Sequence, residues 1–115
     1  MAPRPPLPLL QGSLDLLVLG ALSAGATHGY GVATRVSERS GGAFAVEDAA
    51  LYQALHRLER KGLVAAEWGS SDNNRRAKFY RLTTAGRKRL REQTDGWNRM
   101  VGIMGGALNT RAGEV

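Results

Sequence analysis

A chain of 115 residues is long enough for one small domain whose core is adequate but not generous, so a second copy is expected to add stability. The absence of cysteine excludes disulfide bonds and thiolate metal sites. The two histidines, His28 and His56, lack partners at ligand spacing, so no metal is expected. Gly29-Tyr30-Gly31 lacks the third glycine and the preceding strand of a dinucleotide-binding loop, so no cofactor is expected. With 16 Lys and Arg against 10 Asp and Glu, the surface should attract a polyanion, either a nucleic acid or an anionic membrane face.

The first predicted helix is unusually apolar. Residues 1–8 hold all four prolines, so we expect a mobile, partly extended arm there. A helix is predicted from Leu9 or Leu10 to about Ser23, with one apolar stripe formed by Leu10, Leu14, Leu17 and Ala21. Its other sides are also apolar, so it should pack against its own domain and against a second subunit. A secretory signal is the alternative, but polar interruptions favour a core helix in a cytoplasmic protein.

Two further helices have the relation of a helix-turn-helix pair. After a turn at 24–28, residues 29–40 are predicted to be helical, with apolar Tyr30, Val32, Ala33 and Val36. The next helix, within 47–64 and closed by Gly62, places Leu51, Leu55 and Leu58 on one stripe and leaves Tyr52, Gln53, His56, Arg57 and Arg60 on other faces. Such a helix can lie in the major groove of DNA, although an ordinary surface helix has the same pattern.

A basic hairpin follows the helices. Residues 63–68 and 76–83 are predicted to form strands around a turn at 69–75. Trp68, Tyr80 and Leu82 should pack onto the helices at the base, while Asn73, Asn74, Arg75, Arg76 and Lys78 gather near the tip. Eight Lys or Arg and no Asp or Glu lie between Arg75 and Arg91. A charge run is usually a solvated face, but after a helix-turn-helix pair it indicates a wing that reaches the DNA backbone.

The last predicted helix carries a seam for a partner. Thr83 or Thr84 can cap it, and a 4, 3, 4, 3, 4 spacing relates Leu90, Thr94, Trp97, Val101, Met104 and Leu108. A domain this small offers no internal partner for the seam, so a second subunit is expected. Glycines within the helix predict fraying beyond Met104, and residues 109–115 are expected to be disordered.

Four segments together resemble the PadR family of bacterial transcriptional regulators in its short form, with a single C-terminal dimerisation helix. They are LLQGSLDLLVLGAL, HGYGVATRV, LYQALHRLERKGLV and EWGSSDNNRRAKFYRLTTAGR, and the resemblance covers about Leu9 to Trp97. It implies a mainly α fold with a small β-hairpin, a winged helix-turn-helix of order α-α-α-β-β-α, acting as a homodimeric repressor at pseudo-palindromic operators. On this basis residues 9–83 are the DNA-binding domain and 84–108 the dimerisation helix.

The resemblance also implies roles for particular residues. Some relatives bind flat aromatic effectors between paired tryptophans at the dimer centre, which makes Trp97 a candidate effector site, although a seam tryptophan is more often core. The dimerisation candidates are Leu10, Leu14, Leu17, Leu90, Trp97, Val101, Met104 and Leu108. The major-groove candidates are Tyr52, Gln53, His56 and Arg57, and the wing candidates are Asn74, Arg75, Arg76 and Lys78.

This chain departs from the family pattern at the start of its third helix. Family members commonly have Gly, then Ser or Thr, then Leu-Tyr-Pro, whereas this chain has Ala49, Ala50, Leu51, Tyr52 and Gln53. The hydroxyl that would touch a phosphate is absent, and Gln53 adds a side chain able to read a base, which predicts altered operator preference or weaker binding.

Three other classes of function remain to be weighed. A winged helix that only binds proteins would not need the basic run. An RNA-binding winged helix should expose aromatic side chains near the wing tip, where the sequence offers only Phe79. An enzyme is not expected, because no paired carboxylates and no nucleophile set with plausible geometry are present.

Overall fold

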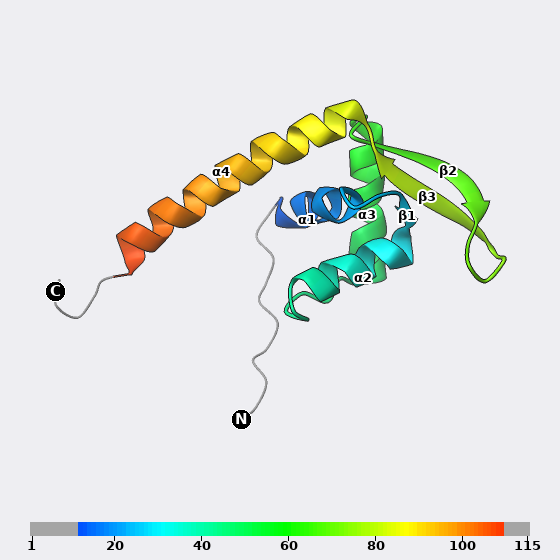
Figure 1. Cartoon of the computed structure of the whole chain (residues 1–115), viewed down its shortest axis with the longest axis horizontal. Coiled ribbons are helices and arrows are strands. Elements are labelled where there is room, and N and C mark those ends of the chain that lie inside the picture. Colours follow the sequence, from blue (N-terminus) through cyan, green and yellow to red (C-terminus); the bar gives the residue numbers. More distant parts are fainter. Residues whose placement is uncertain (1–11, 110–115) are drawn as a thin grey trace, which may run out of the picture.

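The computed structural model describes residues 12–109 and contains four helices and a small sheet within that range. The elements are α1 (Ser13–Leu22), β1 (Thr27–His28), α2 (Gly29–Arg39), α3 (Asp48–Arg60), β2 (Val64–Ser70), β3 (Arg76–Leu82) and α4 (Thr84–Leu108). In Figure 1 the first three helices form a cluster, the hairpin projects to one side and α4 runs away to the other. The expected mainly α fold with a hairpin wing is confirmed. The predicted arm at 1–8, Leu9, Leu10 and the tail beyond Asn109 lie outside the described residues.

The core lies between the three N-terminal helices and the base of the hairpin. Leu51, Leu55 and Leu58 of α3 are 1, 1 and 2% exposed, as their spacing predicts. Each such leucine contributes on the order of 2 kcal/mol of burial free energy. The other core residues come from α1, α2, α3, the α3–β2 connection, β2 and β3, and comprise Val18, Leu19, Ala21, Leu22, Val32, Val36, Ala54, Leu63, Val64, Tyr80 and Leu82. Tyr30, expected on the apolar side of α2, is instead 76% exposed.

Arginines of α2 fix the end of α1. Arg35 Nη1 donates hydrogen bonds to the carbonyl oxygens of Ala21 and Gly25 at 3.0 and 2.7 Å, and Arg39 Nη1 donates to that of Gly20 at 2.8 Å. The last carbonyls of a helix lack a partner within the helix, and Arg35 supplies one to Ala21. Arg39 adds a bond to Gly20, whose oxygen also accepts from Ser23. The two helices are therefore joined by charge-assisted bonds as well as by apolar contact.

The sheet has three strands, one more than expected. Strand order is β1-β3-β2, all antiparallel, and β1 pairs Thr27 with Tyr80 and His28 with Phe79. The segment 24–28 was predicted as a turn, and that prediction is wrong at its last two residues, since two residues are too few to show a strand period. β1 ties the start of α2 to the wing.

Trp68 does not pack onto the helices as predicted. It lies four residues beyond buried Val64 along β2, opposite Lys78, and is 59% exposed, whereas Tyr80 and Leu82 at the base are each 5% exposed. The helix cluster is too narrow to cover the hairpin that far from its base. β2 also continues through Gly69 to Ser70, so the turn is shorter than expected.

The expected helix ends are present around the hairpin. Gly62 has φ 74° after α3, a conformation that favours glycine, and the Thr83 hydroxyl accepts a hydrogen bond from the Gly86 N–H at 3.0 Å to cap α4. Gly86 packs so closely on the carbonyl of Leu63 that a β-carbon there would overlap it. This contact sets the direction in which α4 leaves the domain.

α4 stays helical to Leu108. Its backbone hydrogen bonds continue past Met104, beyond which fraying is expected, to the one that Asn109 N–H donates to Gly105 O at 2.9 Å. Figure 1 shows its C-terminal half projecting beyond the rest of the domain. None of the helices in the described part of the chain is long and apolar enough to cross a membrane.

Candidate nucleic-acid interface

The solvent face of α3 carries most of the predicted base-reading residues. With the leucines turned inward, Tyr52, Gln53 and His56 are exposed, Tyr52 at 50%. Glu47 and Asp48, both exposed, lie at the N-terminal end of this helix, where negative charge suits the helix dipole. The Glu47 side chain makes no capping hydrogen bond, so the helix begins without the hydroxyl or carboxylate cap that helices prefer.

Tyr52 is positioned by the start of α2. Its ring lies against Gly29, where a β-carbon would come within 2.5 Å of the tyrosine hydroxyl oxygen. Gly29 is buried for the same reason. Only glycine at the start of α2 leaves room for this ring. The absence of a side chain at Gly29 therefore allows Tyr52 of α3 to pack there. Tyr52 thus packs on the start of α2.

Arg57 differs from its three neighbours on α3 because it already has a partner. Its Nη2 donates to Asp15 Oδ1 at 2.6 Å and its Nε to Asp15 Oδ2 at 3.4 Å. The hydrogen bond to Asp15 raises the pKa of the Arg57 guanidinium. The Arg57 side chain is 41% exposed and that of Asp15 19%. Arg57 is therefore held toward α1, at the edge of the face that Tyr52, Gln53 and His56 present.

The wing tip is a tight turn with a left-handed asparagine. Asn74 has φ 57°, a conformation that asparagine tolerates better than most residues. The Ser71 N–H donates to Arg75 O at 2.8 Å and the Asn74 N–H to Ser71 O at 2.9 Å. Asn74, Arg75 and Arg76 are exposed. The tip therefore presents a tight, basic turn to solvent.

Two wing cations have neighbours within the protein. Lys78 Nζ lies 3.3 Å from Glu59 Oε1 on α3, and the Arg76 guanidinium carbon lies 4.6 Å from the centre of the Trp68 ring. The ion pair joins the wing to α3, whereas the stack stays within the wing. Only the ion pair therefore holds a positive charge of the wing next to α3.

An open groove of about 690 Å³ separates α3 and the start of α2 from the wing. β1 contributes His28 and α2 contributes Gly29 to its lining, and the other aromatic and basic residues that line it are Tyr30, Tyr52, Trp68, Arg75, Arg76 and Lys78. The groove therefore combines positive charge with exposed rings. A ribbon of phosphates and sugars is a ligand that such a lining suits.

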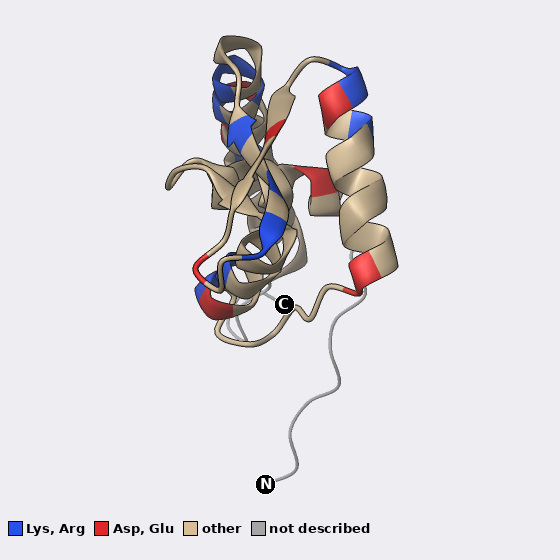
Figure 2. Ribbon diagram, turned by 90° about the vertical axis from the view of Figure 1, so that its right-hand side faces the viewer, with Lys and Arg blue, Asp and Glu red and all other residues tan. Residues whose placement is uncertain are grey.

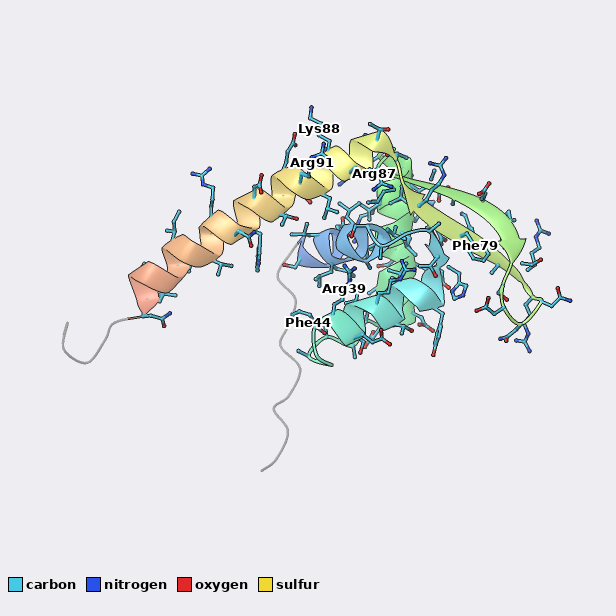
Figure 3. The ribbon with its side chains drawn as sticks, viewed as in Figure 1. Arg39, Phe44, Phe79, Arg87, Lys88 and Arg91 are labelled. Carbon is cyan, nitrogen blue, oxygen red and sulfur yellow. The ribbon has the colours of Figure 1, made fainter. Side chains whose placement is uncertain are left out.

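The basic run seen in the sequence does not form one surface. Arg75, Arg76 and Lys78 line the groove, Arg81 falls on the other face of β3 by strand alternation, and the remaining four lie on α4. Figure 2 shows basic residues both on the wing and on the helix behind it. In Figure 3, Arg87, Lys88 and Arg91 lie on the first turns of α4, which leads away from the wing. Fewer than half of the eight basic residues therefore line the groove.

Sequence reasoning missed three groove residues, His28, Tyr30 and Trp68. His28 caps α2, because its Nδ1 accepts a hydrogen bond from the Gly31 N–H at 3.1 Å, and its ring lies 5.6 Å from that of Phe79. Phe79, expected as the aromatic of the wing tip, is instead half-buried against His28 and over Gly69. A histidine just before a predicted helix start was the available signal for the cap.

The predicted dimer residues fall into two groups. Leu14, Leu17 and Leu90 are half-buried against the core of their own domain, while Leu10 lies outside the described range. Leu90 therefore belongs to the intramolecular contact of α4. The outer part of α4 is different, because large apolar side chains there are 44 to 69% exposed, namely Trp97, Met100, Val101, Ile103, Met104 and Leu108. Met100 and Ile103 widen this apolar face beyond the predicted seam.

A helix-turn-helix followed by a hairpin wing and an extended terminal helix defines a winged helix-turn-helix protein. The chain belongs to the transcriptional regulator PadR-like family, whose model matches residues 18–92. The resemblance found in the sequence is thus confirmed, and the family is one of transcriptional regulators and not of enzymes.

Solved structures support the same assignment. The chain is similar to PadR family regulators from Clostridium difficile (30% identity, TM-score 0.75, 85% of this chain and 100% of that chain) and Eggerthella lenta (31%, 0.74, 88% and 86%). Bacillus subtilis PadR, whose structure was solved in complex with operator DNA, shares the fold at 23% identity and a TM-score of 0.63, over 70% of this chain and 46% of that chain.

Proposed function

We propose that this protein binds double-stranded DNA sequence-specifically as a homodimer and represses a promoter that carries a pseudo-palindromic operator. The observation that carries the proposal is the pairing of α3 with the wing. α3 turns its leucines inward and presents Tyr52, Gln53 and His56 beside a groove whose far wall carries Arg76 and Lys78. The similarity to Bacillus subtilis PadR, which was solved with operator DNA, supports this use of the fold.

In this proposal α3 lies in the major groove. Gln53 is the main base reader, since its amide can form two hydrogen bonds to adenine, and Tyr52 and His56 contact bases or phosphates beside it. Arg57 acts at the edge of the interface, shared between Asp15 and the DNA backbone. The position of Tyr52 over Gly29 places its hydroxyl at the groove between α3 and the wing.

The wing holds the flanking backbone. Arg75, Arg76 and Asn74 at the exposed tip and Lys78 on the groove wall supply the contacts. The Lys78 ammonium group already pairs with Glu59, so in this proposal the arginines contribute most of the phosphate affinity. These contacts set position and salt dependence, while α3 sets sequence preference.

The proposed partner is a second copy of the chain. A continuous row of apolar side chains 44 to 69% exposed is rare on a monomer and typical of an interface. Two copies related by a twofold axis would pack these rows against each other, with Leu14 and Leu17 of α1 at the margin. Such a dimer sets two α3 helices about one DNA turn, roughly 34 Å, apart, which matches an inverted-repeat operator.

Trp97 gives the dimer a means of sensing a planar aromatic effector. Its indole is 44% exposed on α4, and its counterpart in a second copy would supply the other face of a stacking site. Because Trp68 is also exposed, a Trp68→Phe variant isolates the Trp97 fluorescence. Quenching by a planar aromatic compound, together with weaker DNA binding, is expected; fluorescence that ignores every such compound leaves Trp97 a packing role alone.

The direct test is selection of bound fragments from a pool of random DNA duplexes at several salt concentrations. We expect enrichment of an inverted repeat and a dimer by sedimentation. Placing that repeat over a reporter promoter should lower expression, and a rise would mark an activator. A protein that retains no duplex over random competitor contradicts the proposal.

Single-stranded RNA is the informative competitor, because Tyr30, Tyr52 and Trp68 are 76, 50 and 59% exposed in the groove. Exposed rings can stack unpaired bases. Preferential retention of single-stranded RNA in the same experiment would favour the RNA-binding alternative. Preferential retention of duplex DNA excludes it.

A further inference from the structure

Trp68 of the wing is exposed although burial is expected from the sequence, and the register of the hairpin explains its position. Side chains alternate between the two faces of a strand, so Val64, Ala66 and Trp68 on β2 share a face with their partners on β3, Leu82, Tyr80 and Lys78. At the base this face is the buried core. Toward the tip the same face becomes the wall of the groove, where Trp68 lies with Arg76. Trp68 thus continues the core face of the wing into the candidate interface.

Arg76 stacks on Trp68 across the two strands. The cross-strand partner of Arg76 is Ser70, two residues beyond Trp68, so Arg76 and Trp68 are diagonal neighbours within side-chain reach. The guanidinium carbon lies 4.6 Å from the ring centre, a cation–π distance. Arg76 forms no ion pair with any residue in the range 12–109. The indole is therefore the contact that orients this exposed guanidinium.

Stacking leaves the hydrogen-bonding edge of the guanidinium available. A guanidinium is planar, so it can lie face-on over an aromatic ring while its N–H groups, which point outward in the plane, donate to phosphate oxygens. A lysine in the same place would have no such division between face and edge. A stacked arginine also has less side-chain freedom to lose on binding than an unrestrained one.

We propose that Trp68 is a positioning residue for DNA binding, a platform that holds the Arg76 guanidinium over the groove with its edge toward the phosphates of one DNA strand. The inference rests on the proposed function and adds to it the residue through which the wing arginine acts. Trp68 contributes to affinity through Arg76, and the contribution is the same for every DNA sequence because it concerns a phosphate.

The test uses the full chain, a mixed-sequence 30-base-pair duplex and a salt titration, because a phosphate contact does not require the operator. Arg76→Ala is expected to weaken binding about tenfold and to lower the slope of log K against log salt by about 0.9. Trp68→Leu is expected to weaken binding about fivefold at nearly the parental slope, since the charge remains. Trp68→Phe retains a ring and should restore most of the affinity. Arg81→Ala, a cation on the opposite face of β3, is the matched control and should bind like the parent.

The double variant Trp68→Leu with Arg76→Ala decides whether Trp68 acts through Arg76. It should bind no worse than Arg76→Ala alone. A further fivefold loss in the double variant, or a Trp68→Leu variant that binds like the parent, overturns the proposal while leaving the proposed function intact. A parent that fails to retain any duplex overturns both. Thermal unfolding of each variant distinguishes a folding defect from a binding effect. If Trp68→Leu and Trp68→Phe lose equal stability and equal DNA affinity, the proposed role of Trp68 in holding Arg76 is also overturned.

Discussion

Asp15 on α1 accepts a hydrogen bond of 2.6 Å from Arg57 on α3, with a longer second bond to the same guanidinium. This ion pair connects α1, which contributes buried residues to the core, to α3, which carries the proposed DNA-reading face. Arg57 enters the proposed interface with its charge already paired. Its contribution to DNA binding therefore depends on whether Asp15 releases it.

Replacing Asp15 by asparagine should free Arg57 for the DNA backbone. We expect Asp15→Asn to lower the free energy of unfolding by only about 0.5–1 kcal/mol, because the Arg57 side chain is 41% exposed and solvent screens the pair. Affinity for a mixed-sequence duplex should rise, and the salt slope should increase by about 0.9 from one added phosphate contact. The variant Asp15→Asn with Arg57→Ala is the control. An equal rise there would show that loss of a negative charge, and not release of Arg57, is responsible.

Sequence preference and general affinity should separate between α3 and the wing. Gln53→Ala removes the proposed base contact and is expected to cost about 1–3 kcal/mol of discrimination at one operator position while changing the salt slope little. Replacing Arg75 and Arg76 by alanine should weaken binding to all sequences and lower the slope by about two units. Titrations with the selected operator and with one-base variants of it measure both quantities. Parental binding by both variants would place the contacts elsewhere.

Gly29 should resist any side chain as long as Tyr52 is present. A β-carbon at residue 29 would lie 2.5 Å from the Tyr52 hydroxyl oxygen, so Gly29→Ala must displace the ring. We expect a loss of about 1–3 kcal/mol of folding free energy from this overpacking. In a Tyr52→Ala background the same change should cost much less, and the two effects should therefore not add. Additive losses in denaturant unfolding would show that the clash is relieved in some other way.

These contacts indicate which features the sequence could predict. The buried edge of α3, the left-handed Gly62 and the Thr83 cap depend on residues a few positions apart, and all three were predicted from spacing. The pairing of Arg57 with Asp15 and the exposure of Trp68 depend on how distant segments meet, which no local period encodes. Tryptophan is a residue type that often packs in a core. Trp68 reaches the groove instead because the hairpin extends well beyond Val64, a length that the local pattern does not give.

The alanine at the start of α3 can be tested directly. Family members commonly carry Ser or Thr at the position of Ala50, and the Glu47 side chain provides no cap for this helix. Ala50→Ser supplies a hydroxyl that can donate to a phosphate, so affinity for the selected operator is expected to rise about tenfold or more, the range of a hydrogen bond to a charged group. Ala49→Ser, one position earlier on the same helix, is the matched control. Unchanged affinity in Ala50→Ser would show that the missing hydroxyl does not weaken this protein.

A charge placed on the outer part of α4 should separate dimerisation from folding. Val101 is 53% exposed and lies in the apolar row with Trp97 and Met104, so aspartate there costs little in a monomer but buries an unpaired charge in the proposed dimer. We expect Val101→Asp to sediment as a folded monomer with an unchanged far-ultraviolet spectrum of the winged domain. Its affinity for the inverted repeat should fall by at least a hundredfold, while binding to a single half-site stays near that of the parent, because the two reading helices are no longer linked. Arg91→Gln, at an exposed position of the same helix, lowers the net charge by the same single unit and should remain a dimer. A Val101→Asp protein that stays dimeric would place the interface on another surface.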